Sequence, residues 1–228
     1  MDYDSIRLFL KYFSRALMLL LVLPLTNCAK GLVARWQGDD TADREGRITL
    51  NPVAHLDLLG SLAIMLCGFG WSKPLPINFA RMKSYRKGVI LISLTGPVTH
   101  FLSAIILMNV NALLYYTASS IMPPVVLYCI GFVISTLAEI NICLGVISIL
   151  PLPPLDGFVL LHQFAGAKFN RWYYTNMVMI NQISTLILLF LFFVGRLTDG
   201  HFDPLMWLVV FVERLISFTT IWIPAIFG

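Results

Sequence analysis

Residues 38–60 read GDDTADREGRITLNPVAHLDLLG and form a polar segment between two apolar stretches of the chain. A polar segment of this length inside an otherwise compact chain is usually structured or functional. Residues 47–50 alternate like a short strand, and residues 71–78 (WSKPLPIN) carry two prolines, which suit an edge strand and exclude a helix. These two extended pieces, on either side of the apolar residues 56–71, predict a small β-sheet.

Outside this segment the composition is strongly apolar. Of the 228 residues, 58% are hydrophobic and 12% are charged, and the mean hydropathy is +0.81. A soluble fold of this size cannot hide so much apolar surface, because the buried fraction of a domain is limited by its surface-to-volume ratio. The composition therefore indicates an integral membrane protein. It excludes a disordered chain, and with only 4 cysteines it also excludes a disulfide-stapled secreted domain.

Five apolar runs are long enough to cross about 30 Å of hydrocarbon, which takes roughly 20 helical residues. They cover residues 16–34, 89–116, 125–150, 177–194 and 205–227. The apolar stretch 56–71 is shorter and suits a re-entrant or interfacial segment. We expect an all-α membrane protein with five transmembrane helices, one short re-entrant helix and a small β-sheet at the membrane surface. Residues 1–228 are expected to form a single domain, with a core at 17–162 and C-terminal helices at 177–227.

Charge predicts the orientation of this domain. Residues 73–87 carry five basic side chains and no acidic one, whereas residues 117–124 carry no charge. By the positive-inside rule the first segment is cytoplasmic and the second is external. The N-terminus starts outside if residues 56–71 are re-entrant and inside if they span, and charge alone favours the second arrangement. The net charge of +4 comes from scattered Lys and Arg, which indicates contact with the lipid bilayer and its anionic headgroups, and no nucleic-acid partner is expected.

A second unusual stretch lies at the end of the third apolar run. Residues 150–157 read LPLPPLDG, so a proline-broken backbone and the carboxylate of Asp156 are expected at the end of a span. A broken backbone at membrane depth needs protein or water to satisfy its polar groups, so this stretch is predicted to line a cavity.

Five motifs occur in a fixed order and spacing along residues 17–162. They are residues 38–42, residues 46–52 followed by His55 and Asp57, residues 70–74, the Gly96-Pro97 pair, and residues 151–157. Together they resemble the small prokaryotic site-2 proteases, which are intramembrane zinc metalloproteases that cut transmembrane helices. The resemblance implies an integral protein of a prokaryotic cytoplasmic membrane.

The resemblance also implies a zinc site in the first apolar run, twelve residues before Gly38, where the family carries His-Glu-x-x-His. In this chain the positions read Thr26-Asn27-Cys28-Ala29-Lys30. Threonine is a poor zinc ligand, asparagine cannot take up a proton, and the lysine ammonium repels a metal ion. The third family ligand is matched by Asp156. We therefore expect no intact catalytic residue and no bound cofactor, with Asp156 as a remnant zinc ligand.

Other matched positions belong to the family's loop and groove. In this sequence they are Arg47, Asn51, His55, Asp57, Gly96, Pro97, Pro153 and Gly157. His55 and Asp57 are predicted to orient their loop rather than to bind metal. The family's two groove asparagines are replaced by His100 and Ser148, which places substrate binding in question.

The resemblance further requires residues 26–30 and Asp156 to lie on one side of the membrane, which favours the re-entrant interpretation of residues 56–71. Lys30 then stands where the family's second His meets this Asp, and we predict an ion pair between Lys30 and Asp156. The alternative is that Lys30 extends to the headgroups while Asp156 caps its proline-rich turn.

Glu139 and Asn141 are polar residues inside the third apolar run. An ionisable side chain in a span usually faces a partner or a wet cavity, so Glu139 is either a proton or substrate site or a protonated, hydrogen-bonded structural residue. The expected function is that of a pseudoprotease that binds a membrane partner, such as a transmembrane helix of another protein. The alternatives are an active intramembrane zinc metalloprotease with other ligands and a small transporter.

Overall fold

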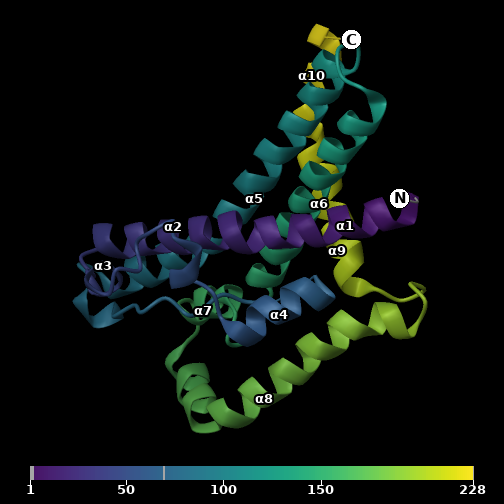
Figure 1. The fold of residues 1–228 in the computed structure, drawn as a ribbon. Helices are drawn as coiled ribbons and strands as arrows, with labels where there is room; N and C mark the ends of the chain where they lie inside the picture. The colour runs from purple at the N-terminus through teal and green to yellow at the C-terminus, as the bar shows by residue number, and fades with distance from the viewer. Residues whose placement is uncertain (1–2, 69, 228) are drawn as a thin grey trace.

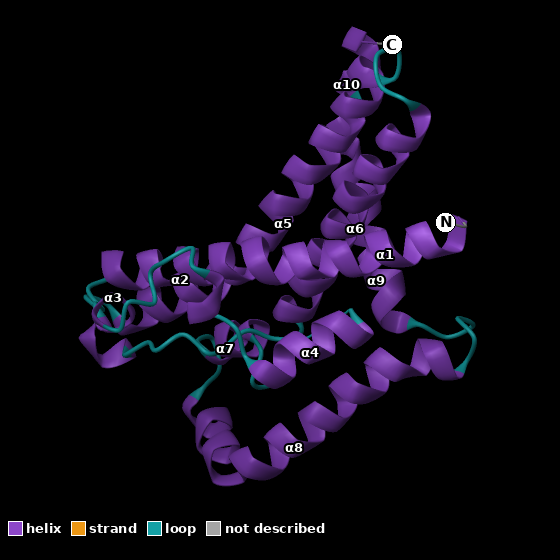
Figure 2. Cartoon of the chain, in the orientation of Figure 1, coloured by secondary structure: helices purple, strands orange, loops and turns teal. Residues whose placement is uncertain are grey.

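The computed structural model describes residues 3–68 and 70–227, and every regular element in this part of the chain is a helix (Figure 2). The first apolar run lies in one long rod, in which α1 and α2 are joined by a short π-helix. A helical hairpin, α5 and α6, forms the centre of the molecule. The elements in chain order are α1 (Tyr3–Leu17), η1 (Met18–Val22), α2 (Leu23–Trp36), α3 (Thr41–Arg44), η2 (Pro52–Ala54), α4 (Leu58–Cys67), η3 (Phe79–Arg81), α5 (Tyr85–Ala118), α6 (Pro124–Ile149), α7 (Asp156–His162), α8 (Ala167–Leu197), α9 (Pro204–Ser217), η4 (Phe218–Thr220) and α10 (Trp222–Phe227).

The prediction of five spans is confirmed by length and composition. In the described part of the chain, five helical segments are long and apolar enough to cross a membrane: Tyr3–Trp36, Tyr85–Ala118, Pro124–Ile149, Ala167–Leu197 and Pro204–Ile226. The first begins well before residue 16, because α1 continues the apolar helix with its charged side chains on one face. The chain is therefore an integral membrane protein built from helices.

The helices pack around the α5–α6 hairpin (Figure 1). α2 packs against α5, α1 and α9 pack against α6, and the short α7 packs against both helices of the hairpin. Met18 and Ile64 are fully buried and belong to the same apolar cluster as Leu144 of α6. α8 runs along one side of the molecule, away from this cluster, and only 11% of its most apolar window is buried. The protein thus has a packed helical core, and α8 is the least buried of the five candidate spans in the described residues.

The short helix α4 has ten residues, which at 1.5 Å per residue reach about 15 Å and cannot cross the membrane. Asp57 caps its start, because Oδ1 accepts a hydrogen bond from Gly60 N at 2.8 Å. At its end, the Arg15 guanidinium donates to the carbonyls of Met65 and Leu66 at 2.6 and 3.0 Å. These carbonyls lack helical partners, and the positive charge of Arg15 lies at the negative end of the helix dipole. Its length fits the predicted re-entrant segment.

The predicted β-sheet is wrong, since the described residues contain no strand. Residues 71–78 do approach residues 47–57, but through single contacts. Lys73 N donates to His55 O at 2.8 Å, and the Arg47 side chain donates to Lys73 O at 3.1 Å. Pro74 and Pro76 have no N–H to extend this pairing into a ladder, and the region stays irregular.

Candidate functional site

Several of the predicted site residues line one cavity of about 410 Å³, here called the central cavity. It is enclosed by α2, residues 70–72, the middle of α5, the end of α6 with the turn into α7, and one face of α8. Thr26, Asn27 and Lys30 from α2 line it together with Asp156 and Gly96. Segments that lie more than a hundred residues apart in the sequence therefore contribute to one site.

Lys30 and Asp156 form a direct ion pair in this cavity. The distance from Lys30 Nζ to Asp156 Oδ2 is 2.6 Å, and the two side chains are 19% and 25% exposed. Gly96 of α5 leaves the space for it, because a Cβ atom there would lie 2.7 Å from Lys30 Cε and 2.9 Å from Asp156 Oδ2. The pair thus joins α2 to the start of α7 across a glycine of α5.

The other two replaced positions also have partners. Thr26 Oγ1 donates to Val22 O one turn earlier in the same helix, at 3.0 Å. The Asn27 amide donates to Ser72 Oγ at 2.9 Å, and its nitrogen lies 3.3 Å from His55 Nδ1. Thr26 and Asn27 are both buried. Asn27 therefore anchors the extended residues 70–72 and the 51–57 turn to α2.

His55 is held in one tautomer by these contacts. Its Nε2 lies 2.8 Å from the carbonyl oxygen of Thr49, which only accepts, so Nε2 carries the proton and Nδ1 accepts from Asn27. Burial lowers the pKa of His55, the nearby Arg47 charge lowers it further, and the bond to Thr49 opposes both effects. A neutral His55 with both nitrogens engaged therefore ties the 51–57 turn to Asn27 and to Thr49.

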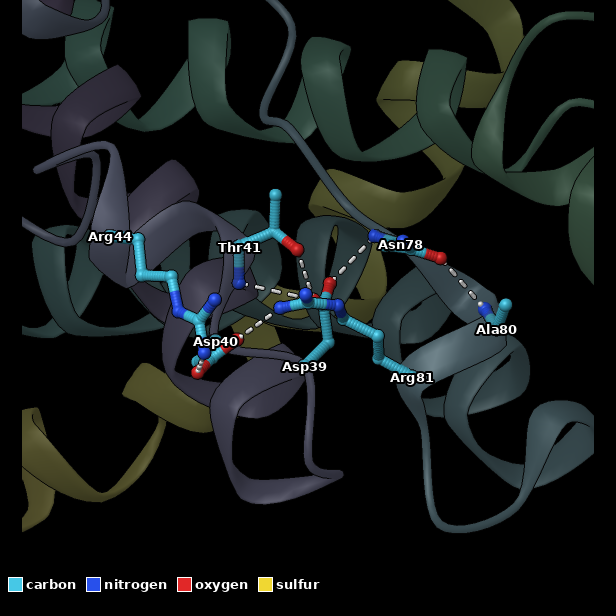
Figure 3. A network of polar contacts seen from close by, with 7 residues as sticks. All are labelled: Asp39, Asp40, Thr41, Arg44, Asn78, Ala80 and Arg81. Atoms are coloured by element: carbon cyan, nitrogen blue, oxygen red, sulfur yellow. Dashed lines mark hydrogen bonds and ion pairs between the residues drawn. The ribbon is translucent and has the colours of Figure 1, made fainter.

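The loop after α2 is fixed by the buried Asp39 (Figure 3). One carboxylate oxygen accepts from the backbone and hydroxyl of Thr41, and the other accepts from Asn78 N at 2.7 Å. The adjacent Asp40 pairs with Arg44 at 2.6 Å and with Arg81 at 2.7 Å. The 38–41 turn is thereby tied to residues 78–81, at the end of the extended segment that supplies Ser72.

The turn into α7 folds tightly against the end of α6. A Cβ atom at Gly157 would lie 1.9 Å from the carbonyl oxygen of Ile149, so only glycine fits at this position. The preceding Pro153–Pro154 peptide bond is cis. Of the remaining predicted residues, Asn51 caps η2 through Val53 N at 3.1 Å, and Pro97 lies inside α5.

His100 and Asn141 form a buried pair between α5 and α6. His100 Nδ1 lies 3.1 Å from Asn141 Oδ1, and Asn141 Nδ2 donates to Leu137 O at 2.8 Å. Because the amide nitrogen of Asn141 donates to Leu137, it is the amide oxygen that faces His100, and this oxygen can only accept. His100 Nδ1 is therefore the donor and carries a proton. His100 lines the central cavity, whereas Glu139 lies outside it.

Comparison with known proteins gives one relative that bears on the family. The chain is 35% identical over 158 residues to a protein of Bacillus subtilis (strain 168) named "Putative zinc metalloprotease YwhC", covering 67% of this chain and 72% of the relative. The chain belongs to the site-2 protease family. No family model matches this chain, and no solved structure matches it.

The residues of this family member do not fit a zinc ion. In the described part of the chain no group of three His, Cys, Asp or Glu side chains is placed to hold a metal. Asp156 Oδ2 is engaged by the Lys30 ammonium, whose charge opposes a second cation. Thr26 is turned back onto its own helix, and both nitrogens of His55 are used.

Two of the contacts described above, one in the site and one at the end of α4, could not be predicted from any pattern in the sequence. Ser72 lies in a matched motif, but nothing in the spacing indicates that it accepts from Asn27. Arg15 counts only as a basic residue before the first apolar run, although it anchors α4. Both contacts depend on segments some fifty residues apart, and sequence patterns report only local periodicity.

Proposed function

We propose that this protein is a pseudoprotease of the site-2 family, in which an ion pair has replaced the zinc site. It holds a transmembrane segment of a partner protein at the central cavity without cutting it. The observation that carries this proposal is the 2.6 Å contact between Lys30 and Asp156 at the matched ligand positions. We place the protein in a prokaryotic cytoplasmic membrane, with the basic residues 73–87 on the inner side.

The proposed loss of hydrolysis follows from chemistry. Metal-assisted peptide hydrolysis needs a Lewis acid to lower the pKa of water and a base to accept its proton. Asn27 stands at the position of the base and its amide cannot accept a proton. Lys30 supplies a positive charge but has no vacant coordination site at which to bind water.

The proposed binding role rests on what the cavity retains. Its walls are largely apolar, from Leu23, Leu144 and the α8 face, with a few polar groups such as Ser148. Helices associate in membranes through close packing supplemented by a small number of polar contacts, which is the kind of surface found here.

Metal content tests the first half of the proposal. We expect the purified protein to hold well under one equivalent of zinc and to leave a model transmembrane substrate intact. The Bacillus subtilis relative YwhC, prepared in the same way, is the matched reference. One tightly held equivalent of zinc, with cleavage that a chelator stops, would show an active protease that uses other ligands.

Photo-crosslinking tests the second half. A photoreactive amino acid at Leu189, which lines the central cavity, is compared with the same residue at Ile106, which is 61% exposed on α5. With a single-span Leu/Ala peptide of about 20 residues in liposomes, we expect several-fold more crosslinking at Leu189. Equal yields at both positions would mean that the cavity does not receive a helix.

A further inference from the structure

A second cavity, here called the distal cavity, lies at the other end of the α5–α6 hairpin. Its volume is about 900 Å³, more than twice that of the central cavity. It is enclosed by the last turns of α5, the first half of α6, and the C-terminal segment from α9 to α10, which runs beside them (Figure 1). None of the residues of the protease-like site lines it.

Two carboxylates line this cavity and lack counter-charges there. Glu139 of α6 and Glu213 of α9 both face it, and its lining contains no Lys, Arg or His. Among the described residues, neither glutamate forms an ion pair within 4 Å, and no hydrogen bond to a protein group is found for either. Basic side chains border two neighbouring hollows that these glutamates also line: Arg7 and Lys11 in one, and Lys11, Arg15 and Arg196 in the other. In the part of the chain that the structure describes, none of them forms an ion pair within 4 Å with either glutamate. Unpaired carboxylates at membrane depth are costly, so a cation entering this space would be stabilised.

Aromatic rings form the other part of the lining. Tyr115 and Tyr116 lie edge to face with centroids 5.6 Å apart, and Tyr128 and Phe132 lie one turn apart on α6 with centroids 6.1 Å apart. Glu139 is eleven residues after Tyr128, or roughly 16 Å along the helix. The aromatic rings therefore lie at the end of the cavity near the α5–α6 turn. The carboxylates lie at its other end, near the middle of the hairpin. Aromatic rings offer a broad apolar surface against which the hydrocarbon groups of an organic cation can pack.

The chemistry of the lining selects among cations. A hard metal ion such as calcium needs six to eight oxygen ligands, and two separate carboxylates in an apolar wall do not provide them. An organic cation gains from both parts, since its charge is neutralised by a carboxylate while its apolar groups contact the rings. A volume of about 900 Å³ lies within the range of pockets that hold drug-sized molecules.

We propose that the distal cavity binds a lipophilic organic cation, an amine or quaternary ammonium compound, with its charge beside Glu139 and Glu213 and its apolar groups against Tyr128 and Phe132. This inference is independent of the zinc site and of the proposed partner binding, because the two cavities share no lining residue.

Ethidium, a fluorescent quaternary cation, is the probe. Its fluorescence is titrated with the purified full-length protein in detergent, and bound ethidium is then displaced with benzyltrimethylammonium or with neopentylbenzene, the neutral molecule of the same shape. We expect saturable binding that benzyltrimethylammonium displaces at least ten times more effectively than neopentylbenzene. Equal displacement by both would overturn the proposal, because the cavity would then respond to shape alone.

Variants locate the site. The double substitution Glu139→Gln and Glu213→Gln should weaken ethidium binding at least tenfold, while Glu45→Gln on the exposed α3 loop should leave it unchanged. Tyr128→Leu should weaken binding about fivefold, and Tyr128→Phe, which keeps the ring, should stay within twofold of the parent. Each variant is first checked for unchanged elution and melting temperature. Unchanged affinity in the folded glutamine double variant would refute the site, and if that variant does not fold, the Tyr128 pair decides.

Discussion

Breaking the Lys30–Asp156 pair should destabilise the protein more than breaking any exposed ion pair. Its two charges are 2.6 Å apart and the side chains are 19% and 25% exposed. At an effective dielectric constant of about 20, unit charges about 3 Å apart attract by roughly 5 to 6 kcal/mol, and desolvation of both groups offsets much of this. Removing one partner of a buried pair costs roughly 3 to 5 kcal/mol, and partial exposure reduces our expectation to about 2 to 3 kcal/mol.

A double-mutant cycle measures the interaction energy between Lys30 and Asp156. The variants Lys30→Met, Asp156→Asn and the combination are unfolded in detergent, and the coupling energy is taken from the free energies of unfolding. Arg35 and Asp43 form the control pair, at 3.4 Å with side chains 59% and 41% exposed, for which coupling of about 0.2 to 1 kcal/mol is expected. A coupling for Lys30 and Asp156 no larger than that of the control would refute the pair as the replacement for the metal.

Four further outcomes are expected. Gly96→Ala should lower the free energy of unfolding by about 1 to 3 kcal/mol, because the added methyl overlaps the ion pair; a neutral effect would place the pair elsewhere. Arg15→Met should cost roughly 1.5 to 3 kcal/mol through two lost charged hydrogen bonds and should speed amide exchange in α4. Because folding lowers the pKa of His55 from 6.5, its contribution to stability is full above pH 6.5 and falls as the pH drops below it, so the melting temperature should decline from pH 7.5 to 5.5 and less so in His55→Gln. Cysteines placed at Asp43 and Tyr85 should be labelled from the same side of the membrane; labelling from opposite sides would mean that the intervening helix spans.

The spans could be predicted because length and composition are sufficient for them. A run of about 20 apolar residues has few alternatives to a transmembrane helix. The start of the first span could not be predicted in this way, since Arg7 and Lys11 interrupt the apolar run before residue 16. In the structure these side chains lie in α1, which is continuous with the span.

The sheet was mispredicted for a physical reason that the sequence does contain. The alternation of polar and apolar residues at 47–50 indicates that a strand there would have one face suited to burial. A β-ladder also needs successive hydrogen-bond donors on both segments. With Pro74 and Pro76 on the opposing segment, Lys73 N is the one donor of this segment that is bonded to the backbone of the 51–57 turn in the described part of the chain. The prolines that suggested an edge strand also prevented the sheet.

The approach of Lys30 to Asp156 could be predicted, because the family resemblance places both at one metal. The contacts of Asn27 could not, since they depend on how residues 55 and 72 fold back onto α2. The sequence places Gly96 in a motif. Only the structure shows that the missing side chain of Gly96 leaves room for the ion pair.

The three replaced positions of the zinc motif are best understood together. If catalytic residues had been lost without compensation, the Asp156 carboxylate and at least one α2 side chain would be left buried without a partner, at a cost of several kcal/mol. Instead Thr26 bonds to its own helix, Asn27 to Ser72, and Lys30 to Asp156. None of these side chains is among the unsatisfied buried groups of the described residues. These side chains therefore satisfy one another and the helices around them, so that the α2 and α7 ends of the site are held together without an uncompensated charge.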